Sequence, residues 1–255
     1  MRIATWNVNS LKVRLPHVLA WLKRHAPDIL CLQETKLEDG KFPVDEIAAA
    51  GYRAIYSGQK TYNGVAMLSR ETCDGIVAAV PGFDDAQKRV LAASVCGIRV
   101  VCVYVPNGES VESDKYRYKL SWLAALNAWL ESELTRFSRL AVLGDLNIAP
   151  EERDVHDPAV CAGQVLFSVP EREAFRALVG LGLTDAFRLF EQPEKSFTWW
   201  DYRMNAFRRK MGLRIDHVLL SPALVERCTA CTVDIEPRVA ERPSDHAPVM
   251  ADLAL

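Results

Sequence analysis

The sequence predicts an α/β fold in which two β-sheets pack face to face and helices cover the outside. Many short apolar stretches bounded by turn residues indicate strands, and only a few longer stretches have the spacing of amphipathic helices. A strand-rich pattern with few helices fits two packed sheets. No long linker or low-complexity tract interrupts the 255 residues, so we expect a single domain over residues 1–255.

The first part of the chain predicts a strand, a helix and a second strand. Residues 2–5 are a short apolar strand, and apolar side chains recur at helical spacing over residues 11–25. Pro27 ends this helix, and residues 29–32 form the next strand. More strands are then expected over 52–56, 62–69, 90–95 and 98–105, the last two as a hairpin.

The second half of the chain adds two helices and several strands. Leucines at helical spacing predict a long helix over 120–134, which leads into an apolar strand that starts at Leu140. A further helix contains Phe175 and Leu178 and closes at the glycines that follow. The remaining strands are expected over 198–202, over 213–220 and directly after His246.

Composition is that of an ordinary globular protein, with 49% hydrophobic and 25% charged residues. No window approaches the roughly 18 unbroken apolar residues of a membrane-spanning helix, so no membrane partner is expected. The first residues lack the apolar core of a signal peptide, and the seven cysteines are an odd, scattered set. We therefore expect a reduced, cytoplasmic protein. We also expect it to be monomeric.

The distribution of charge is more informative than its sum. A net charge of −2 argues mildly against nucleic-acid binding, because such proteins are often strongly basic. Residues 202–214, however, hold five of the 31 basic residues and lie next to several aromatic rings. Such a cluster is usually a solvated segment, but the mixture of rings and cations also suits nucleic acid.

Asp145 and Asn147 interrupt the end of an apolar strand. Residues i and i+2 of an extended segment point to the same side, so the carboxylate and the carboxamide enter one space. A buried carboxylate is costly unless it is paired or bound to a metal. The alternative is a turn in which both side chains bond their own backbone.

Five strand ends carry the same feature, a polar or acidic side chain after or before an apolar run. Each one alone is most simply a helix cap or a satisfied core group, but five together favour a shared site. Converging oxygen ligands suit Mg²⁺, or Mn²⁺ in its place, and one histidine is too few for a typical zinc site. These residues are Asn7, Glu34, Asp145 with Asn147, Asp216, and Asp245 with His246.

At this point the chain resembles the exonuclease III enzymes of the endonuclease/exonuclease/phosphatase superfamily. The resemblance extends over nearly the whole sequence, with the motifs in the family's order. It implies a four-layer α/β-sandwich of two mainly antiparallel sheets and Mg²⁺-dependent cleavage of DNA phosphodiesters. The motifs are Trp6-Asn-Val-Asn-Ser-Leu, Leu32-Gln-Glu-Thr-Lys36, Tyr62-Asn-Gly-Val-Ala, Tyr104-Val-Pro-Asn-Gly, Gly144-Asp-Leu-Asn-Ile-Ala, Trp199-Trp-Asp-Tyr-Arg, Leu213-Arg-Ile-Asp-His and Ser244-Asp-His-Ala-Pro.

The resemblance also implies the metal ligands. Glu34 is then the principal ligand, with Asn7 and Asp245 close to the same ion. A possible second metal site would comprise Asp145, Asn147 and His246.

The resemblance further implies catalytic roles. Asp145 would orient and deprotonate the attacking water, while Asn147 and Tyr104 hold the scissile phosphate. Asp216 would orient His246, which contacts the phosphate either as a base or as a cationic clamp. Hydrolysis of a charged diester needs these components, namely a cation near the developing charge and a positioned base.

DNA contacts are expected mainly from the aromatic and basic segment. Trp199 is expected to stack beside a base or sugar, although packing of it or of Trp200 in the core is an alternative. Residues 115–119 contain two lysines and an arginine that could extend the surface, although they also start a helix. The residues expected to contact DNA are Asn107, Trp199, Arg203, Arg208, Arg209, Leu213 and Arg214.

The expected activity is 3′→5′ exonuclease or 3′-end processing, including 3′-phosphatase and 3′-phosphodiesterase activity, on double-stranded DNA in base excision repair. The expected substrates have damaged or recessed 3′ ends or abasic sites. Abasic-site incision should be weaker, because Leu213 stands where some incising relatives carry Trp, and the 154–168 loop lacks their paired Asn residues. Two alternatives are a phosphatase of the same superfamily acting on a lipid or sugar phosphate, and a DNA-binding module without chemistry.

Overall fold

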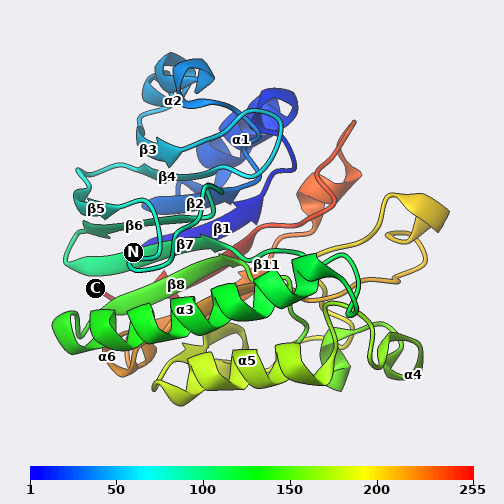
Figure 1. The fold of residues 1–255 in the computed structure, drawn as a ribbon. Helices are drawn as coiled ribbons and strands as arrows, with labels where there is room; N and C mark the ends of the chain where they lie inside the picture. The colour runs from blue at the N-terminus through cyan, green and yellow to red at the C-terminus, as the bar shows by residue number, and fades with distance from the viewer.

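The computed structural model describes residues 1–255 and contains two six-stranded sheets (Figure 1). The first has the strand order β11 (Cys228–Val233), β12 (Val249–Leu253), β1 (Arg2–Asn7), β2 (Ile29–Gln33), β4 (Val65–Ser69) and β3 (Arg53–Ser57). The second has the order β5 (Asp74–Val77), β6 (Val90–Val95), β7 (Ile98–Tyr104), β8 (Leu140–Asp145), β10 (Asp216–Leu220) and β9 (Thr184–Asp185). The predicted pair of sheets is confirmed.

Each sheet contains one parallel strand pair, and all its other neighbours are antiparallel. In the first sheet, helix α1 (Leu11–His25) connects the parallel strands β1 and β2. In the second sheet, helix α3 (Asp114–Arg136) lies between the parallel strands β7 and β8. Parallel neighbours need such a crossover because the chain has to return to the starting end of the sheet.

The helices cover the two outer faces and give the sandwich four layers (Figure 1). Helices α1 and α2 (Val44–Ala49) pack on the first sheet, while α3 and α5 (Val169–Gly180) pack on the second. Alternate strand residues separate the layers: Leu143 belongs to the core between the sheets, and its neighbour Val142 packs under α3 and α5. This alternation decides which side chains reach the space between the sheets.

The remaining helical segments are short. None of the helices is both long and apolar enough to cross a lipid bilayer. All seven cysteines are free thiols. The short segments are α4 (Pro158–Cys161), α6 (Pro222–Val225) and the 3₁₀ turns η1 (Asp39–Lys41), η2 (Glu152–Asp154), η3 (Ala186–Leu189), η4 (Arg203–Asn205) and η5 (Glu236–Val239).

Two predicted strands near the basic segment were wrong in extent. Residues 198–202 form no strand, because Trp199 makes only isolated bridges to Leu213 and His246. The strand predicted over 213–220 begins only at Asp216. Asp216 therefore lies at the start of β10, at the edge where the neighbouring strand β8 ends.

Candidate active site

Polar residues gather at one edge of the sandwich because they continue the inward faces of its strands. On β8, Ala141 and Leu143 face the core between the sheets, and Asp145 continues that face. Strands β1, β2, β7 and β8 end at this edge, whereas β10 and β12 run antiparallel to β8 and β1 and begin there. The apolar filling between the sheets therefore gives way to polar groups at this edge.

The strand register brings three polar residues side by side in the second sheet. Asp145 pairs with Tyr104 of β7 on one side and with Asp216 of β10 on the other. Gly144 is required just before Asp145, since a Cβ there would lie 1.9 Å from the carbonyl oxygen of Val103. The close approach of β7 to β8 thus depends on this glycine.

Asp145 is a buried carboxylate held by two donors. The Asn7 amide Nδ2 donates to its Oδ2 at 2.8 Å, and the Asn147 backbone N–H donates to its Oδ1 at 2.9 Å. The second bond closes a turn in which the Asp145 side chain bonds the nearby backbone, as the alternative interpretation of the sequence predicted. Asp145 therefore forms this turn and also faces the buried site. Burial raises the pKa of Asp145 to about 7, against the attraction of His246. A carboxyl group with such a pKa can exchange a proton near neutral pH.

His246 lies between two carboxyl groups. Its Nδ1 is 2.9 Å from Oδ2 of Asp216, and its Nε2 is 3.7 Å from Oδ2 of Asp145. Burial would lower the pKa of His246, but the carboxylates of Asp216 and Asp145 outweigh it and raise that pKa to about 10. The imidazole therefore carries a proton at neutral pH in the metal-free protein.

Glu34 directly follows β2, whose inward face ends at Gln33. Its Oε2 pairs with Lys36 at 2.8 Å, and its Oε1 accepts from Asn7 Nδ2 at 2.9 Å. Burial opposes ionisation, yet Lys36 and the bond from Asn7 lower the pKa of Glu34. Glu34 is thus a permanently charged group, and its backbone has φ +52°, an uncommon left-handed conformation for a residue other than glycine.

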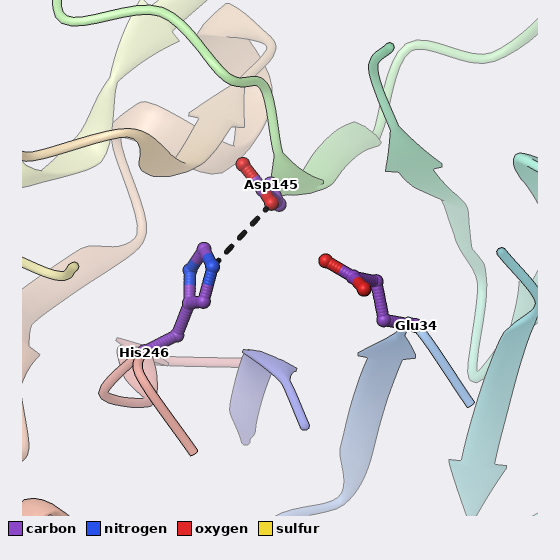
Figure 2. Close-up of side chains that lie close together, drawn as sticks. All are labelled: Glu34, Asp145 and His246. Carbon is purple, nitrogen blue, oxygen red and sulfur yellow. Dashed lines mark ion pairs between the residues drawn. The ribbon is translucent and has the colours of Figure 1, made fainter. Parts of the chain in front are cut away.

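Figure 2 shows Glu34, Asp145 and His246 pointing into one shared space, with their ligand atoms within 4.8 Å of one another. Two carboxylates at this spacing suit a hard divalent cation. One further observation agrees with an excess of negative charge here: Oδ1 of Asp216 is buried and has no hydrogen-bond partner. The residues present therefore fit a divalent metal ion, with Glu34 as its chief ligand and Asp145 close to it.

The other two ligands expected from the sequence are placed differently. Asn7 offers its amide hydrogens to the two carboxylates, while its Oδ1 accepts the Asn9 backbone N–H at 3.0 Å. Asp245 lies outside the cluster of three, and its two oxygens accept from Asn9 Nδ2 at 2.9 Å and Trp199 Nε1 at 3.0 Å. In this arrangement Asn7 bridges the carboxylates and Asp245 anchors neighbouring side chains.

The residues expected around the scissile phosphate do line the cluster. The pKa of Tyr104 is raised well above its usual value by burial and by the carboxylates of Glu34 and Asp145, so its hydroxyl keeps its proton. The Asn147 carboxamide donates to the carbonyl of Val105 at 3.0 Å and accepts from Asn107 Nδ2 at 3.2 Å. Asn147 also has a left-handed backbone, with φ +50°.

Several of the residues expected to contact DNA are corrected by the structure. Arg214 is 1% exposed and pairs with Asp154 and Asp185, because the segment just before β10 bonds to the backbone of η2. Leu213 is 8% exposed and packs in a small apolar cluster with Val155, so it offers little surface. Neither side chain reaches a DNA backbone in this conformation.

The other expected DNA contacts are at least partly exposed. Trp199 is half-buried, whereas its neighbour Trp200 is packed in the core, so only one ring of the pair is available. Asn107 is exposed, and so are the three arginines of the basic segment, Arg203, Arg208 and Arg209. Lys119, in contrast, does not extend the DNA-facing surface as the sequence suggested, because its side chain is completely buried.

Three further residues contact the site residues and were not predicted from the sequence. Lys36 pairs with Glu34, Asn9 links Asp245 to the Glu34 side through Lys36, and the Arg89 guanidinium stacks over the Tyr104 ring at 4.6 Å. Lys36 lies two residues after Glu34, so this pair was visible in the sequence. Arg89 directly precedes β6, and the β6–β7 hairpin places it opposite Tyr104, whose backbone N–H donates to the Arg89 carbonyl at 2.8 Å. This contact was therefore implicit in the hairpin predicted from the sequence.

Comparison with known proteins places the chain and its fold in a family. The model of the Endonuclease/Exonuclease/phosphatase family matches residues 4–246. The chain belongs to this family. It is 35% identical to Exodeoxyribonuclease III of Haemophilus influenzae over 99% of both chains. It is also 32% identical to the DNA repair nuclease APEX1 of Danio rerio, with 100% of this chain and 83% of that relative covered.

Solved structures of this endonuclease/exonuclease/phosphatase fold are similar over the whole length. The 3′ phosphatase NExo from Neisseria, bound to a product DNA hairpin, superposes with a TM-score of 0.98 at 47% identity and covers 100% of both chains. An AP endonuclease from Archaeoglobus fulgidus superposes with a TM-score of 0.96 at 40% identity, again over 100% of both chains. The resemblance to the exonuclease III enzymes noted from sequence motifs is confirmed.

Proposed function

We propose that this chain is a metal-dependent DNA-repair phosphodiesterase that processes the 3′ ends of double-stranded DNA. The observation that carries the proposal is the buried Asp145, whose pKa is raised to about 7 beside Glu34 and the His246–Asp216 pair. A base poised near neutral pH next to a charged cluster suits hydrolysis of a phosphodiester. The similarity to Exodeoxyribonuclease III and NExo supports DNA as the substrate.

Each side chain has a definite task in this mechanism. Asp145 accepts the proton of the attacking water, and the protonated His246 neutralises charge on the phosphate oxygens. Asp216 keeps the imidazole in the orientation that aims Nε2 at the reacting group. Asn147 and Tyr104 donate hydrogen bonds to the phosphate, since the hydroxyl of Tyr104 keeps its proton. This assigns His246 as a clamp and Asp145 as the base.

The proposed cofactor is Mg²⁺, with Mn²⁺ as a substitute. Glu34 supplies hard oxygen ligands, and Asn7 joins it if its carboxamide turns its oxygen toward the ion. When bound, the cation would stabilise negative charge on the phosphate and lower the pKa of a coordinated water. The protein itself contributes the orientation of these groups through the paired strand ends.

The preferred substrate is a 3′ end rather than an internal abasic site. The similar NExo structures are described as a 3′ phosphatase and a 3′–5′ exonuclease. Leu213 is aliphatic and nearly buried, so this chain offers neither a large ring nor much surface at that position. Arg203, Arg208 and Arg209 are exposed, and as surface cations they are the proposed contacts to the phosphates of the flanking duplex.

The deciding experiment compares three labelled duplexes at equal enzyme concentration, carrying a 3′-phosphate, a recessed normal 3′ end or an internal abasic analogue. We expect the first two to be processed faster than the third, EDTA to stop the reaction, and Mg²⁺ or Mn²⁺ to restore it. Full activity in chelator after dialysis against it would exclude the metal site. Hydrolysis of a sugar phosphate or lipid phosphate but of none of the duplexes would favour the alternative phosphatase.

A further inference from the structure

Lys119 is a buried cation that the catalytic scheme does not use. It lies in the first two turns of α3, its side chain is 0% exposed, and burial lowers its pKa. Its ammonium group donates to the backbone carbonyls of Asn107 at 3.1 Å and Asn147 at 2.6 Å, and it pairs with the carboxylate of Glu171. All its polar contacts are therefore internal.

The two carbonyls belong to the loops that carry the proposed phosphate contacts. Asn107 follows the end of β7, and Asn147 follows the end of β8. Their side chains also bond each other at 3.2 Å on the site side of the loops. Lys119 thus bonds the backbone carbonyls of the same two residues whose side chains bond each other. One of these residues, Asn147, is two positions after Asp145.

Glu171 extends this arrangement to a third loop. It is 0% exposed, it forms the capping box of α5 with Ser168, and its Oε1 accepts the Leu166 backbone N–H at 3.0 Å. The Ser168 hydroxyl in turn bonds the hydroxyl of Tyr116 at 2.5 Å, one turn before Lys119 on α3. Helices α3 and α5 lie side by side on the outer face of the sheet (Figure 1). The Lys119–Glu171 and Tyr116–Ser168 contacts join these two helices.

The chemistry of the group indicates positioning rather than stability. Burying two charges is expensive, and apolar replacements of such pairs are often neutral or stabilising. An apolar pair, however, cannot donate to two carbonyls on separate loops. The ammonium group does so with three donors in a tetrahedral arrangement, which fixes the distance between the loops.

We propose that Lys119 and Glu171 are positioning residues that lock the Asn107 and Asn147 loops, so that Asn147 and Asp145 meet the reacting phosphate in the productive geometry. The inference rests on the proposed function, since it concerns the same site. Neither side chain touches the substrate; both act through the backbone of Asn147.

The chain offers a matched control at the other end of α3. Arg99 of β7 and Glu133 of α3 form a second buried pair, each side chain 2% exposed and 2.6 Å apart. Arg99 also donates to a backbone carbonyl, that of Gly75 at 2.7 Å. The pair lies at the end of β7 opposite Tyr104, so its loss tests a buried ion pair without contact to the site.

The experiment compares Lys119→Met/Glu171→Gln with Arg99→Met/Glu133→Gln in the full chain with Mg²⁺ on a duplex with a 3′-phosphate. We expect kcat of the first variant to fall about 100-fold, the cost of misplacing reacting groups by about 1 Å. KM should change by less than about threefold, and the control should keep wild-type kcat. An unchanged kcat in the first variant, or an equal loss in the control, overturns the proposal.

Two further measurements keep the outcome decisive. If the double variant does not fold, Glu171→Gln alone should lower kcat about tenfold, because the ammonium group loses the partner that holds it; an unaltered kcat would count against the inference. If the wild-type chain processes none of the duplexes, the proposed function fails, but hydrogen exchange still tests the lock. The backbone amides of residues 105–109 and 145–149 should exchange faster in the Lys119→Met/Glu171→Gln variant than in the wild type. They should exchange at the wild-type rate in the Arg99→Met/Glu133→Gln control, and an unchanged rate in both variants overturns the inference.

Discussion

Each sheet contains a parallel strand pair, connected through a helix, that leads to an acidic residue. The charges around these two acidic residues differ. In the first sheet, β1, α1 and β2 lead to Glu34, and in the second, β7, α3 and β8 lead to Asp145. Both carboxylates accept a hydrogen bond from the same Asn7 amide group. The backbone framework therefore delivers two equivalent acidic groups to one space.

Their neighbours make the two carboxyl groups different. Burial opposes ionisation of both, but Lys36 lowers the pKa of Glu34, whereas the pKa of Asp145 is raised to about 7. Asp216, the register partner of Asp145, adds a like charge that Glu34 does not have. A permanently charged group and a group that exchanges a proton suit a metal ligand and a base, respectively.

The sharpest test of this difference is Asp145→Asn. The substitution keeps the shape of the side chain but removes the base, so kcat should fall about 10⁴-fold. Binding of duplex DNA should change little, because the exposed arginines are untouched. Single-turnover cleavage and a fluorescence binding titration measure the two effects, and near-normal turnover by a folded variant would refute the role of Asp145.

A smaller effect is expected for Glu34→Gln. The neutral amide is a poorer ligand, so the Mg²⁺ concentration that gives half of the maximal rate should rise about 100-fold. At saturating Mg²⁺ much of the rate should return, in contrast to Asp145→Asn. A titration of rate against Mg²⁺ for both variants measures this, and a loss of rate that Mg²⁺ does not relieve would assign Glu34 a direct chemical role.

The smallest effect is on stability in the metal-free protein, and its sign differs between the two groups. A raised pKa means that folded Asp145 keeps a proton that the unfolded chain has released, so its contribution to stability falls as pH rises from about 4 to about 7. Glu34, with a lowered pKa, contributes stability above its unfolded pKa of about 4.3, and this is lost as pH falls through the folded pKa.

At pH 8 in EDTA, Asp145→Asn should therefore raise Tm and Glu34→Gln should lower it. Each change of 1 kcal/mol corresponds to about 2–4 °C for a chain of this size. Differential scanning calorimetry of the two variants beside the wild type measures both shifts. Shifts of the same sign in both variants would contradict the electrostatic difference between the two halves.

Patterning was enough to predict the elements that bury a regular face. The helix over 11–25 and the hairpin of β6 and β7 are found where their periodicities place them. The segment over 198–202 was misjudged, because aromatic residues favour strands in general, yet here Trp200 packs into the core and Trp199 reaches Asp245. Local propensity could not anticipate those distant partners.

The sequence by itself determined that polar groups end the inward faces of several strands, because the period of two is a local property of an extended chain. That property places Asp145 and Asp216 on the inward faces of β8 and β10, whereas Glu34 and His246 were selected because they flank the ends of apolar strands. Only the tertiary structure decided which of them meet, that Asn7 bridges two carboxylates, and that Arg214 and Lys119 are buried rather than exposed. Burial and charge pairing depend on residues far apart in the chain, and they decide the pKa of each group and hence its chemistry.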